Sequence, residues 1–417
     1  MISQAWRRAF TGLLGLGGNA AVRAGVAVIG LAAASRSSTP NALGIFGAIQ
    51  AYILFHMLVQ QAIVTEPLRV LAQNKDDKAE LQRVILGAWS KQKQVALFFG
   101  IVLLLYVIFS LHVISIGVVF WAMVWLLATA AVTPWMYSAM GKGLRFGAID
   151  TPWRILGILL LGANHFWLGA SLNGILAAYA ISSLGGAANL LIDSLKMFSI
   201  PYLRAWQPGK ATWARADIAA TVARSSFVAY GRLPQVLVAT AFPIASLAIP
   251  LAVERIARTV VSTSAPVASA LLPMAAEKNA SGGSKKILGV MAVLGMALGT
   301  VIFVAAPLIA DRVLARSSQD VITGLRFSGL LVTLAVLNHS MFYHFFLVKG
   351  TWRQATSAGG VALLVSMLGV FLGVRYWGVL GFIGGLIAGE LSAIVMAAGL
   401  QLNDARKTTR IDVAEDI

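Results

Sequence analysis

The chain alternates long apolar stretches with short polar segments, and this pattern predicts helices that cross a membrane. An apolar helix of about 20 residues is long enough to span a hydrocarbon core of about 30 Å. Twelve stretches meet this criterion in windows of about 19 residues. They cover residues 10–34, 43–65, 88–110, 113–139, 153–171, 174–196, 222–247, 249–273, 286–309, 321–347, 354–375 and 378–402. The pattern therefore predicts an all-α polytopic membrane protein with about 12 transmembrane helices.

The composition excludes most other classes of protein. Of the 417 residues, 58% are hydrophobic and only 12% are charged, whereas an ordinary soluble domain has about 25% charged residues. The sequence has no cysteine, which excludes disulfides, thiolate metal sites and cysteine nucleophiles. It also lacks Walker, Rossmann and serine-nucleophile motifs. We therefore expect neither an enzyme nor a bound cofactor or metal.

The basic residues are distributed unevenly between alternate loops, and this predicts the topology. Of the 33 Lys and Arg residues, 24 fall in segments on the same side as the N-terminus, Arg154 among them, and 5 fall on the other side. Basic residues are enriched in cytoplasmic loops, so both termini are predicted to be cytoplasmic. The net charge of +17 is explained by this topology and by attraction to anionic lipid headgroups. Nucleic acid is not an expected partner, because no basic domain stands free of the membrane.

A polar stretch between the sixth and seventh spans predicts that the chain has two halves. Pro201, Pro208 and Gly209 interrupt the helical pattern there, and duplicated helical bundles are common in transporters. The predicted division is an N-terminal six-helix bundle at residues 1–200, a cytoplasmic linker at 201–221, a C-terminal six-helix bundle at 222–403 and a cytoplasmic tail at 404–417.

Two local patterns make further predictions about helix ends and helix packing. Asp77 and Glu80 have the spacing of a capping box, so the third helix is expected to extend into the cytoplasm. Glycines at four-residue spacing let helices approach closely, which predicts tight packing within the bundles. They are Gly295 and Gly299, Gly369 and Gly373, and Gly381, Gly385 and Gly389.

Four arginines lie well inside predicted spans, at least six residues from either end, namely Arg23, Arg232, Arg255 and Arg258. An arginine at the centre of a membrane helix costs about 2.5–3.5 kcal/mol, so each needs an acidic partner or a water-filled cavity. Glu254 precedes Arg258 by four residues, which places the two on one helix face. Glu390 is the other acid deep within a predicted span. Two interpretations remain open: a wet cationic cavity that binds substrate, or arginines that are fully paired for structural reasons.

The second predicted span adds uncharged polar side chains. Gln50, His56 and Gln61 lie along this helix. They are expected either to hydrogen-bond the hydroxyls of a sugar or to contact a neighbouring helix, and the pattern does not choose between the two. The histidines of the chain do not have the spacing of a metal site.

The segment that follows the first span carries a family resemblance. It runs Arg36-Ser-Ser-Thr-Pro40-Asn-Ala-Leu43-Gly44-Ile-Phe46. It resembles the R-x-L-G-P-x-x-F-G-x-F signature of polysaccharide (Wzx-like) flippases in the multidrug/oligosaccharidyl-lipid/polysaccharide exporter superfamily. Arg36, Pro40, Gly44 and Phe46 match at the right spacing. Thr39 stands where glycine is usual, and Leu43 where an aromatic residue is usual.

The resemblance implies a MATE-like fold, with two six-helix bundles around a central cavity lined largely by helices one, two, seven and eight. It implies a protein of the bacterial inner membrane that flips undecaprenyl-diphosphate-linked oligosaccharide by alternating access, for synthesis of surface polysaccharide such as O-antigen or exopolysaccharide. The expected partners are this lipid-linked oligosaccharide, membrane lipids and polysaccharide polymerase machinery. Arg23, Arg232, Arg255 and Arg258 would bind the anionic diphosphate. The side chains of Gln50, His56, Gln61, Glu254 and Glu390 are candidates for polar lining or coupling.

Two other functions compete with this prediction. A cation-coupled multidrug exporter of the same superfamily usually has an acidic residue in its first helix. The first helix here offers Arg23 and no acid. A membrane scaffold that transports nothing is the other alternative, but it would not need arginines near the midplane.

Overall fold

The computed structural model describes residues 4–39, 41–65, 67, 71, 77–113, 115–132, 134–167, 169–201, 213, 215–276, 281–342, 346 and 351–415. Every regular element in this part of the chain is a helix, as the sequence predicts. The first half contains α1 (Gln4–Ser35), α2 (Ala42–Ile63), α4 (Lys78–Leu105) with the π-helix η1 (Tyr106–Ser110), α5 (Ile116–Ala131), α6 (Pro134–Ala139), α7 (Gly143–Trp167) and α8 (Leu172–Met197). The second half contains α10 (Arg215–Ala229), α11 (Leu233–Ala241), α12 (Ile244–Ala276), α13 (Ser281–Arg312), α14 (Gln319–Met341) and α15 (Trp352–Glu415).

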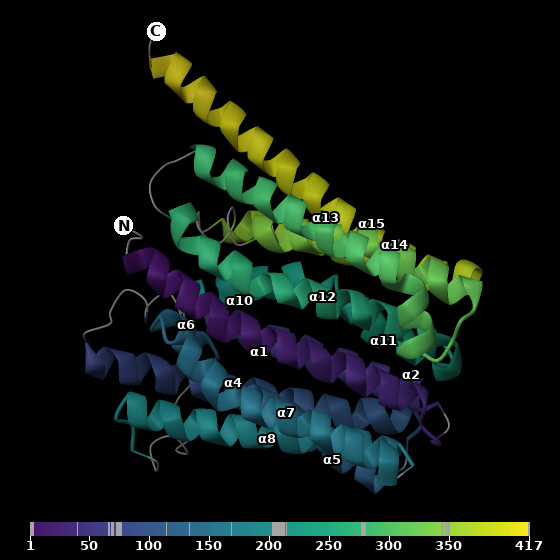
Figure 1. Cartoon of the computed structure of the whole chain (residues 1–417). Coiled ribbons are helices and arrows are strands. Elements are labelled where there is room, and N and C mark those ends of the chain that lie inside the picture. The colour runs from purple at the N-terminus through teal and green to yellow at the C-terminus, as the bar shows by residue number, and fades with distance from the viewer. Residues whose placement is uncertain are drawn as a thin grey trace.

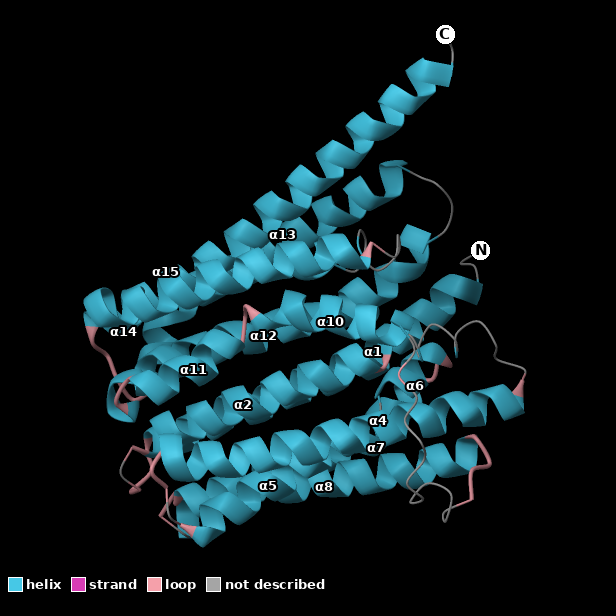
Figure 2. Ribbon diagram, turned by 180° about the vertical axis from the view of Figure 1, so that it is seen from behind, coloured by secondary structure: helices cyan, strands magenta, loops and turns pink. Residues whose placement is uncertain are grey.

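The helices form two groups that meet along one seam (Figures 1 and 2). In the first group α1 packs on α7, and α8 packs on both α5 and α7. In the second group α14 packs on α12, α13 and α15. The seam consists of α1 and α2 against α10, α11 and α12. Both chain termini lie at the same end of the molecule, which we call the terminal end; the other is the opposite end.

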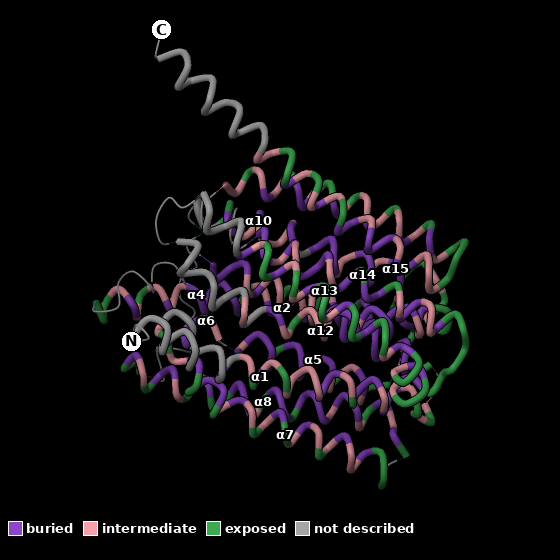
Figure 3. The backbone as a smooth tube through the Cα atoms, turned by 45° about the horizontal axis from the view of Figure 1, so that its top comes forward, coloured by how far each residue is buried: buried purple, intermediate pink, exposed green. Residues whose placement is uncertain are grey.

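The helices are long and apolar enough to cross a membrane. Nine helical stretches meet that criterion within the described residues. One of them, Trp352–Gln401, is 50 residues long and holds the last two predicted spans. Large apolar side chains on the outer faces are exposed, for example Leu159 and Leu368 at 64% and 65%. Figure 3 shows buried positions on the inner faces of the same helices. This distribution is expected when the surrounding solvent is lipid.

The structure corrects the prediction that the seventh span, 222–247, is one continuous helix. The chain leaves the helix at 230–232 and again at 242–243, so that α10, α11 and α12 are separate. Pro243 cannot donate a backbone hydrogen bond, and Pro234 occupies the first turn of α11, where a proline is tolerated. The fourth predicted span is likewise divided into α5 and α6.

Close glycine contacts hold the second half together, as the four-residue spacing predicts. In α15 the chain reverses at Gly378, which has φ +53°, so the two arms of the helix pack antiparallel. A side chain added to Gly373 would overlap the backbone of Gly381, and one added to Gly385 would overlap Gly369. Between α13 and α14 the corresponding close pair is Gly299 and Gly329.

Two further predictions concern segments that flank the helices. Asp77 caps α4, because its Oδ1 accepts a hydrogen bond of 3.0 Å from the backbone N–H of Glu80, so the helix begins at Lys78 as expected. Pro208 and Gly209 of the predicted linker lie outside the described residues, as does Pro40 of the signature segment.

Candidate functional site

Charged side chains gather in one layer of the molecule, near the middle of the helices. Arg23 lies about 18 Å along α1 from its end at Ser35, and Glu390 about 18 Å along α15 from Gly378. Arg255 and Arg258 lie about 16 and 21 Å along α12 from Ile244. Half of a hydrocarbon core is about 15 Å thick. The layer is therefore at the depth where a charge must be paired or hydrated.

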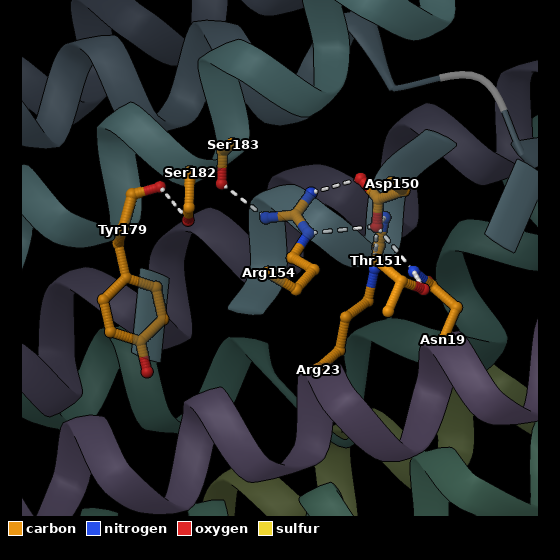
Figure 4. Close-up of polar contacts among 8 residues, drawn as sticks. All are labelled: Asn19, Arg23, Asp150, Thr151, Arg154, Tyr179, Ser182 and Ser183. Carbon is orange, nitrogen blue, oxygen red and sulfur yellow. Dashed lines mark hydrogen bonds and ion pairs between the residues drawn. The ribbon is translucent and has the colours of Figure 1, made fainter. Parts of the chain in front are cut away.

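In the first half, the charged residues form a cluster around Asp150 (Figure 4). We call it the Asp150 cluster, and it consists of Asn19, Arg23, Asp150 and Arg154. Arg23 donates to Asp150 Oδ2 at 2.8 and 3.0 Å from Nη2 and Nε. Arg154 donates to both carboxylate oxygens at 3.0 Å and to Ser183 Oγ at 2.9 Å. The Asp150 side chain is 0% exposed, the Arg154 side chain 8% and the Arg23 side chain 28%.

The Asp150 cluster corrects the sequence-based placement of Arg154. That residue was counted with the cytoplasmic loops, and Asp150 was not considered as a partner for Arg23. Helix α7 begins at Gly143, ten residues before the predicted fifth span. The predicted span begins late because Arg145, Asp150 and Arg154 lower the hydropathy of the first turns of the helix. The four-residue spacing of Asp150 and Arg154 is the signal that could have placed them on one helix face.

In the second half, a cluster forms around two acids. We call it the Glu390 cluster, and it consists of Tyr230, Arg232, Glu254, Arg258, Asn338 and Glu390. Arg258 Nη1 lies 2.7 Å from Glu390 Oε1, and its Nε lies 3.4 Å from Glu254 Oε1. Arg232 donates to Glu254 Oε1 at 3.0 Å. The Tyr230 hydroxyl and the Asn338 amide donate to Glu390 Oε2 at 2.8 and 2.6 Å.

The break between α10 and α11 builds this cluster. Helix α10 ends at Ala229 and α11 begins at Leu233, so Tyr230 and Arg232 lie on irregular backbone. A side chain at Gly231 would come within 2.9 Å of the guanidinium of Arg258, so glycine leaves room for that side chain. The spacing correctly pairs Glu254 with Arg258, and Glu390 is the second partner of that arginine.

Arg255 differs from the other four arginines of the layer. Within the described residues it has no ion pair, and its buried Nε has no hydrogen-bond partner. Its electrostatic neighbours are Glu254 and Tyr179, the second of which comes from the first half. Tyr179 also lies beside Gln50, but it donates its proton to the carbonyl of Val26 at 2.8 Å. Both amide atoms of Gln50, which is 1% exposed, are left without a partner.

A small cavity, lined in part by polar side chains, lies beside Arg23 in the first half. Its volume is about 50 Å³, and its lining includes Gln60, Gln61, Gln92 and Trp135, which is room for about one or two water molecules. Gln60 Oε1, Gln92 Oε1 and Trp135 Nε1 are buried there without a hydrogen-bond partner. Donors and acceptors without partners suit a hydroxyl-bearing or hydrated group.

The polar stripe of the second span is therefore divided between different surroundings. Gln61 lines the cavity with Arg23. His56 is 0% exposed, and its Nε2 lies 2.8 Å from Gln60 Nε2. Gln50 lies beside Tyr179, which is also an electrostatic neighbour of Arg255.

At the opposite end of the molecule, direct contacts join the two halves. Ser35 Oγ donates to the carbonyl of Val313 at 2.9 Å, and Arg36 donates to the carbonyls of Arg312 and Val313 at 2.5 and 3.3 Å. Gly44 packs directly against the backbone of Ile244. These contacts close the seam at that end.

Comparisons with known proteins establish what kind of fold this is. No protein-family model matches the chain, and no curated protein matches it. A multidrug resistance MATE family transporter of the MOP superfamily, in an inward-facing conformation, matches with a TM-score of 0.67 at 16% identity, over 98% of this chain and 100% of that chain. An outward-facing transporter of this kind has a TM-score of 0.55 at 14% identity, over 98% of both chains. The lipid II flippase MurJ, in an inward closed conformation, has a TM-score of 0.60 at 9% identity, over 91% of this chain and 86% of that one. The chain therefore has the MATE transporter fold that the sequence predicts.

Proposed function

We propose that this protein flips an amphiphile with an anionic headgroup across the bacterial plasma membrane, and that the amphiphile is an undecaprenyl-diphosphate-linked oligosaccharide. The transporter fold supports this proposal, since MATE transporters and a lipid II flippase have it. The signature around Arg36 supports the oligosaccharide branch of the superfamily. Both termini would be cytoplasmic, as the distribution of basic residues predicts.

The single observation that carries the proposal is the uncompensated positive charge at Arg255. The layer contains five arginines and three carboxylates among the described residues: Arg23, Arg154, Arg232, Arg255 and Arg258, with Asp150, Glu254 and Glu390. The formal excess is two positive charges. A cation inside the membrane without a counter-ion is costly, so an anionic ligand is the natural partner. The planar guanidinium suits a phosphate, because it can donate two parallel hydrogen bonds.

The two halves would hold different parts of the headgroup. Arg255 and Gln50 are both neighbours of Tyr179 at the seam, and we propose that the diphosphate binds there. Arg23 can leave Asp150 without leaving that carboxylate uncompensated, because Arg154 still donates to both of its oxygens. The cavity beside Arg23 offers Gln60, Gln61 and Gln92 to sugar hydroxyls. Opening toward the outside would then break the hydrogen bonds of Ser35 and Arg36 to the second half.

A cation-coupled multidrug exporter is the second candidate. The supporting observation is that several matching structures are multidrug transporters. The excess of arginine over carboxylate argues against it, because a cationic drug or a coupling ion needs a free carboxylate. Each carboxylate of the layer already contacts an arginine.

The test uses cells of the source organism that lack the gene. We expect complete lipid-linked repeat units to accumulate, detected by mass spectrometry, and surface polysaccharide to be lost. The Arg255→Gln variant should fail to restore the polymer at normal protein level, and Arg255→Lys should restore it in part. The control is Arg316→Gln, at an exposed position in the loop at the opposite end. Normal lipid pools and normal polymer in the deletion strain would contradict the proposal, and drug efflux would then be measured.

A further inference from the structure

A second and much larger cavity lies between the two halves on the side of the molecule that faces lipid. Its volume is about 650 Å³, within the range of about 300–1,000 Å³ for ligand pockets. Tyr52 and Phe99 line it from the first half, and Val236 and Leu237 from α11 of the second half. Residues on its rim are open to the surroundings, with Phe109 exposed to 69%. We call this cavity the lateral groove.

The walls of the lateral groove are apolar because its tyrosine hydroxyls are turned to the backbone. Tyr52 donates to the carbonyl of Phe99 at 2.8 Å, and Tyr106 donates to the carbonyl of Val236 at 3.4 Å. The ring of Tyr52 packs on the rings of Phe99 and Tyr106, with centroids 5.9 and 5.6 Å apart. A surface of packed aromatic rings whose tyrosine hydroxyls are already hydrogen-bonded suits a hydrocarbon chain.

Irregular helices form both walls of the groove. On one side α4 ends in the π-helix Tyr106–Ser110, and such π-helical turns occur often at functional sites. On the other side α11 is only nine residues long, between the break at Arg232 and the extended backbone of Phe242. The lateral groove therefore lies where each half departs from a regular membrane helix.

The length and the charge of the surroundings identify the occupant. From Phe98 to Ser110 the groove follows α4 and η1 for about 18 Å, slightly more than the thickness of one leaflet. A groove of this length with an apolar lining suits a hydrocarbon chain that lies along one leaflet. Arg232 directly precedes Leu233, a residue of the groove wall, so the arginine layer adjoins the inner end of the groove.

We propose that the lateral groove binds the isoprenoid chain of the substrate while its headgroup is held at the arginine layer. The position of the headgroup rests on the function proposed above, whereas the binding of a hydrocarbon chain in the groove does not. A chain that fills the groove contacts both halves at once. The affinity of the groove for the chain therefore depends on how the two halves are positioned relative to each other.

The test is photo-crosslinking of the full-length protein in phosphatidylcholine vesicles. The probes are a benzophenone-labelled polyprenol, which is neutral, and the corresponding polyprenyl phosphate. We expect both to label peptides within 98–110 and 233–240. The Leu237→Trp/Thr240→Trp variant, which fills the groove, should reduce labelling about tenfold. The control Leu368→Trp, at a lipid-exposed position of α15 outside the groove, should leave labelling unchanged.

Competition by unlabelled lipids distinguishes an isoprenoid from an ordinary phospholipid in the groove. It uses the parent protein, so it remains informative if the tryptophan variant does not fold. Unlabelled polyprenol should abolish labelling of the parent protein, and the same excess of phosphatidylglycerol should not. Equal competition by phosphatidylglycerol, or labelling spread evenly over lipid-facing helices, would overturn the proposal.

The neutral probe separates the two proposals. Labelling by polyprenol should persist in Arg255→Gln, whereas labelling by polyprenyl phosphate should fall. If polyprenol labels the groove but the phosphate gives no arginine dependence, the groove proposal stands and the headgroup proposal fails. If polyprenyl phosphate labels the protein in an arginine-dependent way but polyprenol does not label the groove, the groove proposal fails and the headgroup proposal stands.

Discussion

The Asp150 cluster and the Glu390 cluster solve the same problem, buried charge near the midplane, in different ways. In the first half one carboxylate holds two arginines, which leaves a formal charge of +1. In the second half two carboxylates hold Arg232 and Arg258, which leaves no net charge. The Arg23 side chain is 28% exposed, whereas Arg232 and Arg258 are exposed to only 11% and 10%.

The difference teaches which arginines can exchange partners. Removing one member of a buried ion pair costs about 3–5 kcal/mol, because it leaves the other charge unpaired. In the Glu390 cluster Arg258 is the only cation that contacts Glu390 within the described residues, so it cannot leave without that cost. In the Asp150 cluster Arg154 remains when Arg23 leaves. The first half is therefore suited to ligand exchange, and the second half to holding its helices together.

The largest effect is expected from breaking the Glu390 cluster. Arg258→Met should lower the free energy of unfolding by about 3–5 kcal/mol, because Glu390 keeps Tyr230 and Asn338 but loses its counter-charge. Thermal unfolding of the purified protein in detergent would measure this. Adding Glu390→Gln to Arg258→Met should restore most of the loss, since a neutral amide can still accept from Tyr230. An Arg258→Met protein as stable as the parent would show that the pair is not structural.

Each cluster also depends on a glycine that leaves room for it. In α8 a side chain at Gly186 would lie 2.6 Å from Asp150 Oδ1, and in α15 one at Gly389 would lie 2.6 Å from Ser366 Cβ. Ser366 in turn donates to the carbonyl of Tyr230 at 3.0 Å. Gly186→Ala and Gly389→Ala should each destabilise by about 1–3 kcal/mol through overpacking.

Matched controls for these two variants exist on neighbouring parts of the bundles. Gly162→Ala in α7 and Gly384→Ala in α15 have nothing within 4 Å of the added Cβ. They should be neutral or slightly stabilising, because alanine favours a helix by about 1 kcal/mol over glycine. Equal melting temperatures for the test and control variants would show that the close contacts relax without cost.

The sequence predicts the pair of Glu254 and Arg258 within one helix, but not the pairs that join different helices. Hydropathy predicts that Arg23, Arg232 and Arg258 lie near the midplane, because this depth depends only on position along a helix. The partner of Arg23 is 127 positions away in α7, and only tertiary packing brings the two together. The break at 230–232 was missed because Tyr230 and Gly231 do not interrupt the apolar pattern. Asp150 was missed for the opposite reason, since its own charge made the predicted span begin too late.

A smaller effect on stability is expected from removing Arg23. Arg23→Gln should cost about 1–2 kcal/mol, since Asp150 keeps Arg154 and the amide of Asn19, which donates at 2.8 Å. Arg154→Gln should cost more, because that side chain is almost fully buried. Both would be compared by thermal unfolding, and complementation of surface polysaccharide would be scored beside it. If Arg23 binds the headgroup, Arg23→Gln loses complementation while its melting temperature stays near that of the parent. A melting temperature as low as that of Arg154→Gln would instead make Arg23 structural.

The smallest effect is expected from an ion pair outside the layer. Arg145 and Asp193 join the terminal ends of α7 and α8 at 2.6 Å, with the arginine side chain 49% exposed. Such surface pairs contribute about 0–1 kcal/mol. Asp193→Asn should therefore change stability by no more than that, since an amide oxygen can still accept from Tyr137, which now donates at 2.8 Å.

Salt distinguishes this surface pair from the buried clusters. At about 1 M salt the screening length falls to about 3 Å, so the difference between Asp193→Asn and the parent should vanish. The loss of unfolding free energy in Arg258→Met should persist at the same salt concentration, because buried pairs are screened far less. If salt removed both differences equally, ions would have access to Glu390. The second half would then be as open to exchange as the first, and the contrast between the two clusters would fail.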